Sequence, residues 1–300
     1  MKIGFYVLGK KGYIALVEFR KSFGFDSIAF VMGARDIGVE NDWHNEIAAL
    51  CSTNGVVFHT KGASDSNLLP DSDFQFAIGW RWMIKTASDL VVFHDSLLPK
   101  YRGFAPLVNM LVDGVNEIGV TALLASDEYD KGDIIYQARK SISYPKKISS
   151  AIDEIIPLYS ELVEKIVNDI SSLGRVNSFP QDENLASYSL WRDEKDYFID
   201  WNWEAEKIRR FVDAVGAPYR GAAAFVKGKV VRVHEVTQIR DVVVENRKAC
   251  IGKIIFFHSA CPVVVCGRGL LKITDIQSED GNSIIGSIQF RSRFESKSEL

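Results

Sequence analysis

Two residues suited to proton transfer, His94 and Asp130, each follow a short apolar run of the sequence. His94 comes directly after Leu90–Phe93, and Asp130 follows Thr121–Ala125 on a segment that continues into Lys131-Gly132. If both runs are strands, the imidazole and the carboxylate lie at strand ends, where open parallel sheets bind their ligands. A carboxylate that orients an imidazole or a water makes a general acid–base pair. On spacing alone, a structural role for His94 is about as frequent as a catalytic one.

The elements that would hold these residues alternate between strand-like and helix-like segments over the first two-thirds of the chain. Short apolar runs predict buried strands at Lys2–Leu8, Ser27–Met32, Gly55–Thr60, Phe74–Ile78 and Leu90–Phe93. Helical spacing predicts helices at Tyr13–Ser22, Asp42–Asn54 and Ser150–Leu173. We expect Gly9-Lys10-Lys11-Gly12 to break the chain between the first strand and the first helix. The alternation predicts an α/β domain, a Rossmann-like and mostly parallel sheet with helices on both faces.

The last hundred residues differ in texture. An amphipathic helix is expected at Asp200–Val215, and short runs rich in Val and Ile follow it, separated by turn residues. These runs lie at Ala222–Val226, Lys229–Val236, Lys253–Phe257, Val263–Val265, Leu270–Ile276 and Ile284–Phe290. Their spacing predicts a smaller C-terminal all-β domain that is barrel-like or OB-like. We therefore expect a first domain over residues 1–185, a linker over 186–202 and the β domain over 203–300.

Composition and charge narrow the class of protein. Apolar residues make up 47% of the 300 residues and charged residues 25%, as in soluble globular proteins. Residues 1–200 carry 20 Lys and Arg against 28 Asp and Glu, an acidic balance that would repel a nucleic acid. No apolar run reaches the roughly 20 residues of a membrane-spanning helix, and the first residues lack the pattern of a signal peptide. Four cysteines form neither a disulfide framework nor a set with metal-ligand spacing, so we expect a cytoplasmic protein without a metal.

A longer block around His94 resembles a known family. It reads His94-Asp95-Ser96-Leu97-Leu98-Pro99-Lys100-Tyr101-Arg102-Gly103 and continues through Gly119-Val120-Thr121 to Asp130-Lys131-Gly132. In residue types, order and spacing, this block resembles the signature of the folate-dependent formyltransferases. Ile199-Asp200-Trp201 and Ala217-Pro218-Tyr219 are similar to the linker and barrel entry of the longer members, which act on transfer RNA or on nucleotide-linked sugars.

The resemblance implies a reaction and two sets of binding residues. A primary amine would attack the formyl carbon of 10-formyltetrahydrofolate; His94 would stabilise the oxyanion, and Asp130 would hold a water or accept the amine proton. Reduced folate would contact Trp80, Arg81, Trp82, Met83, Asp127, Glu128 and Tyr129. The acceptor substrate would contact Lys10 and Arg102. The alternatives are core packing for the aromatic pair, a plain turn around Lys10 and a structural arginine at Arg102.

Two positions depart from the family pattern. Val92 stands where the family has an asparagine two residues before the histidine, and Leu123 stands where a second family histidine is expected. The resemblance implies that the asparagine amide holds the formyl oxygen, and loss of one such donor commonly costs about 10²–10³ in rate. The enzyme is then slower, another donor replaces the amide, or catalysis is lost. We expect an active enzyme because His94 and Asp130 are present.

The resemblance is closest to the sugar N-formyltransferases, because Val7-Leu8-Gly9-Lys10 lacks the Gly-Thr-Pro that follows the first strand of the transfer-RNA enzymes. It implies a nucleotide-linked amino-deoxy sugar, such as a dTDP-sugar, as acceptor in surface polysaccharide biosynthesis, for example of lipopolysaccharide O-antigen. The alternatives are a methionyl-tRNA formyltransferase and a non-catalytic homologue that binds folate or a nucleotide. No membrane partner is expected, and the apolar β domain could supply a homodimer interface.

Overall fold

A computed structural model describes residues 1–62, 69–86 and 89–296 of the chain. The chain forms two compact units: the first falls within residues 1–107, 116–142 and 151–190, and the second within 108–115, 143–150 and the part from 191 onwards. Each unit has a sheet of its own. The division into residues 1–185, 186–202 and 203–300 stays a proposal.

A seven-stranded sheet with the order β3-β2-β1-β4-β5-β7-β8 forms the first unit. Its strands are β1 Ile3–Val7, β2 Ile28–Gly33, β3 Phe58–Thr60, β4 Phe74–Ile78, β5 Asp89–His94, β7 Glu117–Leu124 and β8 Ile134–Ser141. The pairs from β3 through to β5 are parallel, whereas β7 and β8 pair antiparallel. The predicted α/β class with a mostly parallel sheet is confirmed. The strand order reverses between β1 and β4, the position where such sheets form their ligand crevice.

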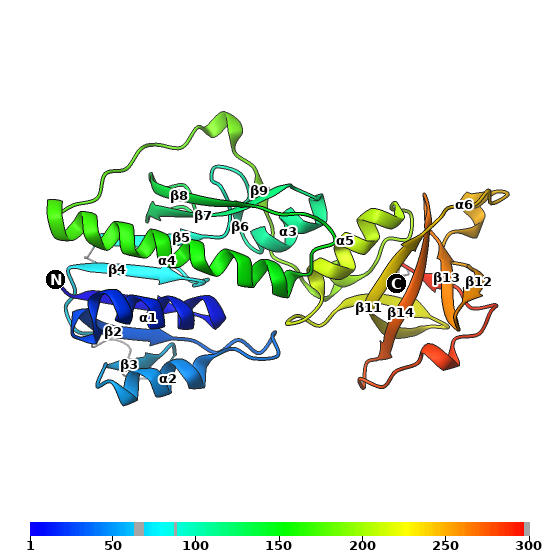
Figure 1. The fold of residues 1–300 in the computed structure, drawn as a ribbon, viewed down its shortest axis with the longest axis horizontal. Coiled ribbons are helices and arrows are strands. Elements are labelled where there is room, and N and C mark those ends of the chain that lie inside the picture. Colours follow the sequence, from blue (N-terminus) through cyan, green and yellow to red (C-terminus); the bar gives the residue numbers. More distant parts are fainter. Residues whose placement is uncertain (63–68, 87–88, 297–300) are drawn as a thin grey trace. The chain divides into compact units, whose positions relative to one another are not determined.

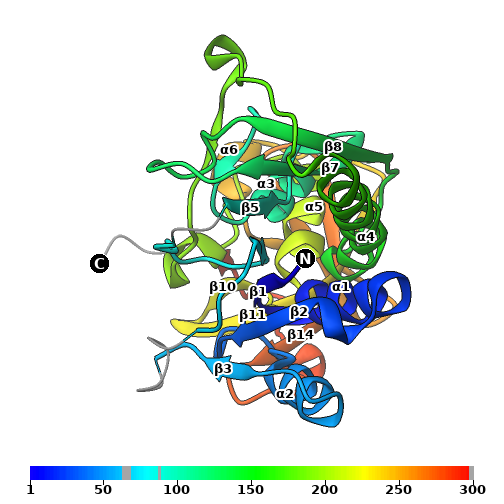
Figure 2. The same ribbon diagram turned by 90° about the vertical axis from the view of Figure 1, so that its left-hand side faces the viewer.

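Three helices run along one side of this sheet: α1 Gly9–Phe23, α2 His44–Thr53 and α4 Ile148–Leu173 (Figures 1 and 2). The ring of Phe5 in β1 contacts Phe19 of α1, and the ring of Phe93 in β5 contacts Tyr159 of α4. The opposite face carries a cluster of buried residues: Tyr6, Phe30, Met32, Ala77 and Leu90. Segments that follow β3 and β4 supply Leu69, Trp80 and Ile84, which pack against this cluster. These segments therefore help to cover the sheet face opposite α1, α2 and α4.

Helix α1 begins at Gly9, although the sequence predicts a break before a helix at Tyr13. A Cβ atom on Gly12 would lie 2.6 Å from the Cβ of Val7, so glycine at this position lets the helix start close against β1. Ala15, Leu16 and Phe19 then form the buried face. The four residues from Gly9 to Gly12 are therefore the first turn of the helix, at the carboxyl edge of the sheet.

Several short elements connect the longer strands and helices before residue 190. Strands β6 Arg102–Gly103 and β9 Tyr188–Ser189 pair in parallel as a two-stranded sheet. The remaining elements before residue 190 are η1 Phe25–Ser27, α3 Pro106–Asp113 and η2 Glu183–Leu185. Strands β6, β8 and β9 are not among the elements predicted from the sequence.

The second unit contains a six-stranded antiparallel sheet with the order β12-β13-β14-β11-β10-β15. Its elements are η3 Glu194–Tyr197, α5 Ala205–Val215, β10 Ala222–Val226, β11 Lys229–Ile239, α6 Arg247–Cys250, β12 Ile254–His258, β13 Cys261–Val265, β14 Leu270–Ser278, η4 Ile285–Ser287 and β15 Phe294–Glu295. The smaller C-terminal β domain is confirmed, and the finer OB-like assignment stays a prediction. The strand expected at Ile284–Phe290 is wrong: Ile285–Ser287 form the single helical turn η4, and the next strand that the structure describes is β15.

Candidate active site

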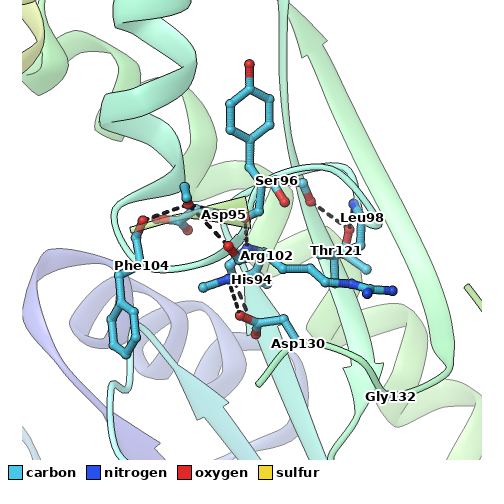
Figure 3. A network of polar contacts seen from close by, with 12 residues as sticks. His94, Asp95, Ser96, Leu98, Arg102, Phe104, Thr121, Asp130 and Gly132 are labelled. Carbon is cyan, nitrogen blue, oxygen red and sulfur yellow. Dashed lines mark hydrogen bonds and ion pairs between the residues drawn. The ribbon is translucent and has the colours of Figure 1, made fainter. Parts of the chain in front are cut away.

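The structure brings His94 and Asp130 together (Figure 3). His94 is the last residue of β5, and Asp130 lies on the loop between β7 and β8. Nδ1 of His94 is 3.3 Å from Oδ1 of Asp130, and Nε2 of His94 lies 2.7 Å from the carbonyl oxygen of Tyr101. The two side chains are only 7% and 10% exposed. This is the pair that the sequence analysis selected.

The hydrogen-bond partner of one ring nitrogen of His94 assigns that nitrogen its role. The Tyr101 carbonyl can only accept a hydrogen bond, so Nε2 carries a proton and donates to it. Nδ1 then faces a carboxylate oxygen of Asp130, which also accepts. A ring N–H held at a strand end is the kind of donor that stabilises a developing oxyanion.

The other oxygen of Asp130 ties its loop to the signature block. Oδ2 of Asp130 accepts a hydrogen bond of 2.8 Å from the backbone N–H of Gly103. Gly103 has φ +97°, and a Cβ atom there would lie 2.6 Å from the carbonyl oxygen of Ser189. Gly132 is equally constrained, because its Cβ would lie 1.7 Å from the carbonyl oxygen of Leu124. The two glycines of the signature thus allow the close backbone approach that places the Asp130 carboxylate.

Thr121 holds the bend that follows His94. Its hydroxyl donates to the carbonyl oxygen of Ser96 at 2.6 Å and accepts from the backbone N–H of Leu98 at 3.0 Å. Nε2 of Gln137 donates both to that hydroxyl, at 2.9 Å, and to the carbonyl oxygen of Leu98, at 2.8 Å. The threonine of the Gly-Val-Thr motif therefore shapes the turn after the catalytic candidate, as Figure 3 shows.

A partly buried charged network adjoins His94 in the sequence. The Asp95 carboxylate accepts hydrogen bonds from the Lys11 ammonium and from the Tyr159 hydroxyl. Burial alone would raise the pKa of Asp95, but the charge of Lys11 and the two hydrogen bonds bring it below its ordinary value. Burial, together with the Asp95 charge, raises the pKa of Tyr159 well above its ordinary value. The network joins α1, the end of β5 and α4, and sequence reasoning missed it because its members lie far apart in the chain.

Arg102 is fully buried and holds the loop. Its guanidinium donates to the Glu183 carboxylate at 2.8 and 2.7 Å, to the amide oxygen of Gln181 at 3.1 and 2.8 Å, and to the Tyr188 hydroxyl at 3.3 Å. The hydrogen bonds to Glu183 raise the pKa of Arg102 above its ordinary value. The structural alternative of the sequence analysis is thus what the structure displays. A contact with the acceptor substrate, which stays a prediction, would require these bonds to open.

The other predicted acceptor contact, Lys10, lies in the first turn of α1. Its ammonium pairs with the carboxylate of Asp153 at 2.5 Å, and both side chains are more than a third exposed. Such a surface pair opens at little cost, so Lys10 can exchange this partner for another anion. Its role in binding the acceptor stays a prediction.

The residues predicted to hold folate form two groups in the first unit. Trp80, after β4, packs edge-on against Tyr6 and Trp82, with ring centroids 5.3 and 5.1 Å apart. Arg81 pairs with Asp36 at 2.5 Å. Met83 is 51% exposed. Trp80 therefore contributes to core packing, whereas Arg81 and Met83 face solvent.

The second group, Asp127, Glu128 and Tyr129, is exposed and directly precedes Asp130. Glu128 pairs with Lys131 at 2.6 Å. The ring of Tyr129 lies 5.6 Å from that of Phe104. No described contact tests the folate-binding role of either group.

Two family models match this chain. The formyl transferase model matches residues 80–155, which include the His94–Asp130 pair, and the model of the formyl transferase C-terminal domain matches residues 192–292. The chain belongs to the formyltransferase family. The resemblance in the signature block is thereby confirmed.

Known formyltransferases resemble the chain in sequence and in fold. A methionyl-tRNA formyltransferase of Halothermothrix orenii is 31% identical over 186 residues, 61% of this chain and 58% of that protein. The crystal structure of WlaRD, a sugar 3N-formyl transferase with dTDP and 5-N-formyl-THF, superposes with a TM-score of 0.67 at 15% identity and covers 93% of this chain and 98% of that one. An N-formyltransferase from Helicobacter canadensis, in complex with folinic acid and dTDP-3-aminofucose, gives 0.65 at 17% identity, with 93% and 99% covered. The match thus spans under two-thirds of the curated relative, and the structural likenesses establish the fold alone.

The two departures from the formyltransferase pattern lie directly opposite each other. Val92 of β5 pairs in register with Leu123 of β7. Val92 is half-buried and packs against a cluster formed by Leu98, Leu123 and Ile134. Where the family pattern has two polar residues, this chain has Val92 and Leu123, which pack against each other. Val92 is two residues from His94 on the same strand, so both side chains point to the same face of the sheet.

Two general properties concern the whole described chain. Among residues 1–62, 69–86 and 89–296, no group of three or more His, Cys, Asp or Glu could hold a metal ion. Within the same ranges, no helix is both long and apolar enough for a membrane crossing. The expectation of chemistry without a metal stays a prediction.

Proposed function

We propose that the protein is an N-formyltransferase that moves a formyl group from 10-formyltetrahydrofolate to the primary amine of a nucleotide-linked amino-deoxy sugar. The observation that carries the proposal is the His94–Asp130 pair at the carboxyl end of β5, in the segment matched by the formyl transferase model. The enzyme would act in the cytoplasm, and its product would be used for surface polysaccharide.

In the proposed reaction, the amine nitrogen attacks the formyl carbon and a C–N bond forms. The carbonyl oxygen gains negative charge, and a ring N–H of His94 stabilises it after exchanging its partner in this structure for the oxyanion. Asp130, or a water that it holds, takes the proton that the amine nitrogen loses. The bond from the formyl carbon to N10 of folate then breaks, N10 receives a proton, and the carbonyl is restored. No covalent bond to the enzyme is needed, so positioning and charge stabilisation are the protein's contributions.

The acceptor class rests on charge and on the related structures. Residues 1–200 carry an excess of acidic residues, which would repel a polyanion the size of transfer RNA. The related structures WlaRD and the Helicobacter canadensis enzyme contain dTDP or dTDP-3-aminofucose. Methionyl-tRNA is the second candidate acceptor, because the curated relatives in the comparison are methionyl-tRNA formyltransferases.

The test is a steady-state assay of the purified protein with 10-formyltetrahydrofolate. The acceptors are dTDP-linked 3-amino and 4-amino sugars in one arm and methionyl-tRNA in the other. We expect release of tetrahydrofolate and a formylated sugar, and no formylated methionyl-tRNA. Formylation of methionyl-tRNA alone would replace the sugar proposal by the second candidate. Tight binding of reduced folate without turnover of any acceptor would identify a non-catalytic homologue.

A further inference from the structure

One glutamine side chain connects the loop of Asp130 to the loop of Arg102. Nε2 of Gln181 donates to the carbonyl oxygens of Asp130 and Gly132, at 2.8 and 2.7 Å. Its Oε1 accepts from Nε and Nη2 of Arg102, at 3.1 and 2.8 Å. Both amide hydrogens and both lone pairs of Gln181 are therefore used, the full capacity of this side chain.

Gln181 belongs to a segment, residues 179–189, that we call the strap. The strap is anchored at one end by two backbone hydrogen bonds between Phe179 and Ile134, of 2.8 and 2.9 Å. At the other end, the carbonyl of Ser187 accepts from the N–H of Arg102 at 2.8 Å, and the carbonyl of Ser189 accepts from the N–H of Phe104 at 2.9 Å. The strap therefore crosses both loops that carry the signature, and Gln181 is bonded to each of them.

The backbone of Asp130 needs such support. Asp130 has φ +57°, in the left-handed region that residues with a side chain seldom occupy. This conformation directs its carboxylate to His94 and to the N–H of Gly103, while its carbonyl oxygen turns towards Gln181. An amide that bonds the carbonyls of both residue 130 and residue 132 stabilises this loop conformation over its alternatives.

We propose that Gln181 is a positioning residue for Asp130: it sets the distance between the Asp130 carboxylate and the His94 imidazole. The expected effect on turnover rests on the proposed function, whereas the expected effect on the distance between Asp130 and His94 does not. A displacement of about 1 Å at a catalytic group can cost about 10²-fold in rate. Gln181 would therefore affect turnover through Asp130, since its amide is fully bonded within the protein.

The first test compares two identical substitutions. Gln181→Met removes both donors at similar side-chain length, and Gln75→Met makes the same change at a buried glutamine near the amino end of β4. We expect Gln181→Met to lower kcat by about 10-fold to 100-fold, with KM for the folate changed less than about threefold. Gln75→Met should leave kcat within about twofold of wild type, because the same principle requires displacement at the reacting groups. Equal effects of the two substitutions on kcat would overturn the proposal.

A second variant separates positioning from general stability. In Gln181→Glu the carboxylate still accepts from Arg102, but it faces two carbonyl oxygens with no proton to donate. The protonated acid would donate again, and a free glutamic acid titrates at about pH 4.3. The ratio of kcat for Gln181→Glu to that of wild type should rise as the pH falls, and the Gln181→Met ratio should stay flat. A flat ratio for both variants would contradict the proposal, and thermal melts check that each is folded.

NMR signals of the His94 ring test the positioning role of Gln181 without any measurement of formyl transfer. The ring nitrogens of His94 can be followed by ¹⁵N NMR, with the signal assigned by its absence in His94→Asn. We expect Gln181→Met or Gln181→Glu to shift the Nδ1 signal that reports the Asp130 contact, and Gln75→Met to leave it in place. This contrast is expected whether or not the wild-type protein formylates any acceptor tested. Unchanged His94 signals in a folded Gln181 variant would refute the positioning role.

Discussion

Replacing Val92 by asparagine tests how the apolar contact in β5 affects catalysis. Val92 lies in register between Ala77 of β4 and Leu123 of β7 and packs against Leu98 and Ile134. An amide at this position would share the sheet face of His94. If it donates to the oxyanion, it lowers the barrier by about 2.7–4 kcal/mol, as measured for single oxyanion donors. If it stays unpaired in the apolar cluster, it lowers the free energy of unfolding by about 1–3 kcal/mol.

The two effects appear in different measurements. We expect folded Val92→Asn to have kcat raised about tenfold or more, together with a lower Tm, because the neighbouring cluster supplies the amide with no partner other than the substrate. Val92→Thr is the matched control: it buries a hydroxyl at nearly the same volume but offers no amide. It should lower Tm without raising kcat.

A folded Val92→Asn enzyme that is no faster than wild type would refute this reasoning. Another donor would then already serve the oxyanion. The indole N–H of Trp80 is one candidate, since it is buried, has no hydrogen-bond partner among the described residues and packs on the sheet face that Val92 also contacts. Trp80→Phe would slow the enzyme in that case, and it would not if Val92 alone limits the rate.

Three further outcomes are expected. His94→Asn should lower kcat by at least about 10², and near-native turnover in steady-state assays would exclude His94 from the transition state. Lys11→Met should lower the free energy of unfolding at neutral pH by up to about 3 kcal/mol, since it leaves the partly buried Asp95 carboxylate without its cation. The pKa of Asp95 is lowered in the folded state, so its stabilising contribution is present above about pH 4 and is lost as the pH falls through that pKa. Thermal melts over a pH series should therefore show that the loss of stability in Lys11→Met becomes smaller in acid. Burial raises the pKa of Cys51 and of Cys266 to about 12, so in native protein these thiols should react with a thiol reagent at mild pH far more slowly than the other two cysteines; four equally fast thiols would contradict this.

The sequence by itself determined the class of fold and the centre of the site. Strands and helices depend on local periodicity, so most segments of the sheet and the long helix α4 could be predicted within a few residues. The position of His94 could also be predicted from the sequence, because a residue directly after a buried parallel strand must lie at the edge of the sheet where the strands have their carboxyl ends. Local patterns failed at two places: Gly12 permits α1 to start at Gly9, and Ile285–Ser287 form a helical turn where a strand was expected.

Tertiary structure alone decided how the site is held. Arg102 finds its partners Gln181 and Glu183 about eighty positions later in the chain, and Asp95 finds Lys11 and Tyr159 on two different helices. No local pattern encodes such pairs, because hydrogen bonds and ion pairs depend on which loops the fold brings within about 3 Å of each other. A strap that follows the last helix of the first unit thus determines where the Asp130 carboxylate lies, which the signature around His94 could not reveal.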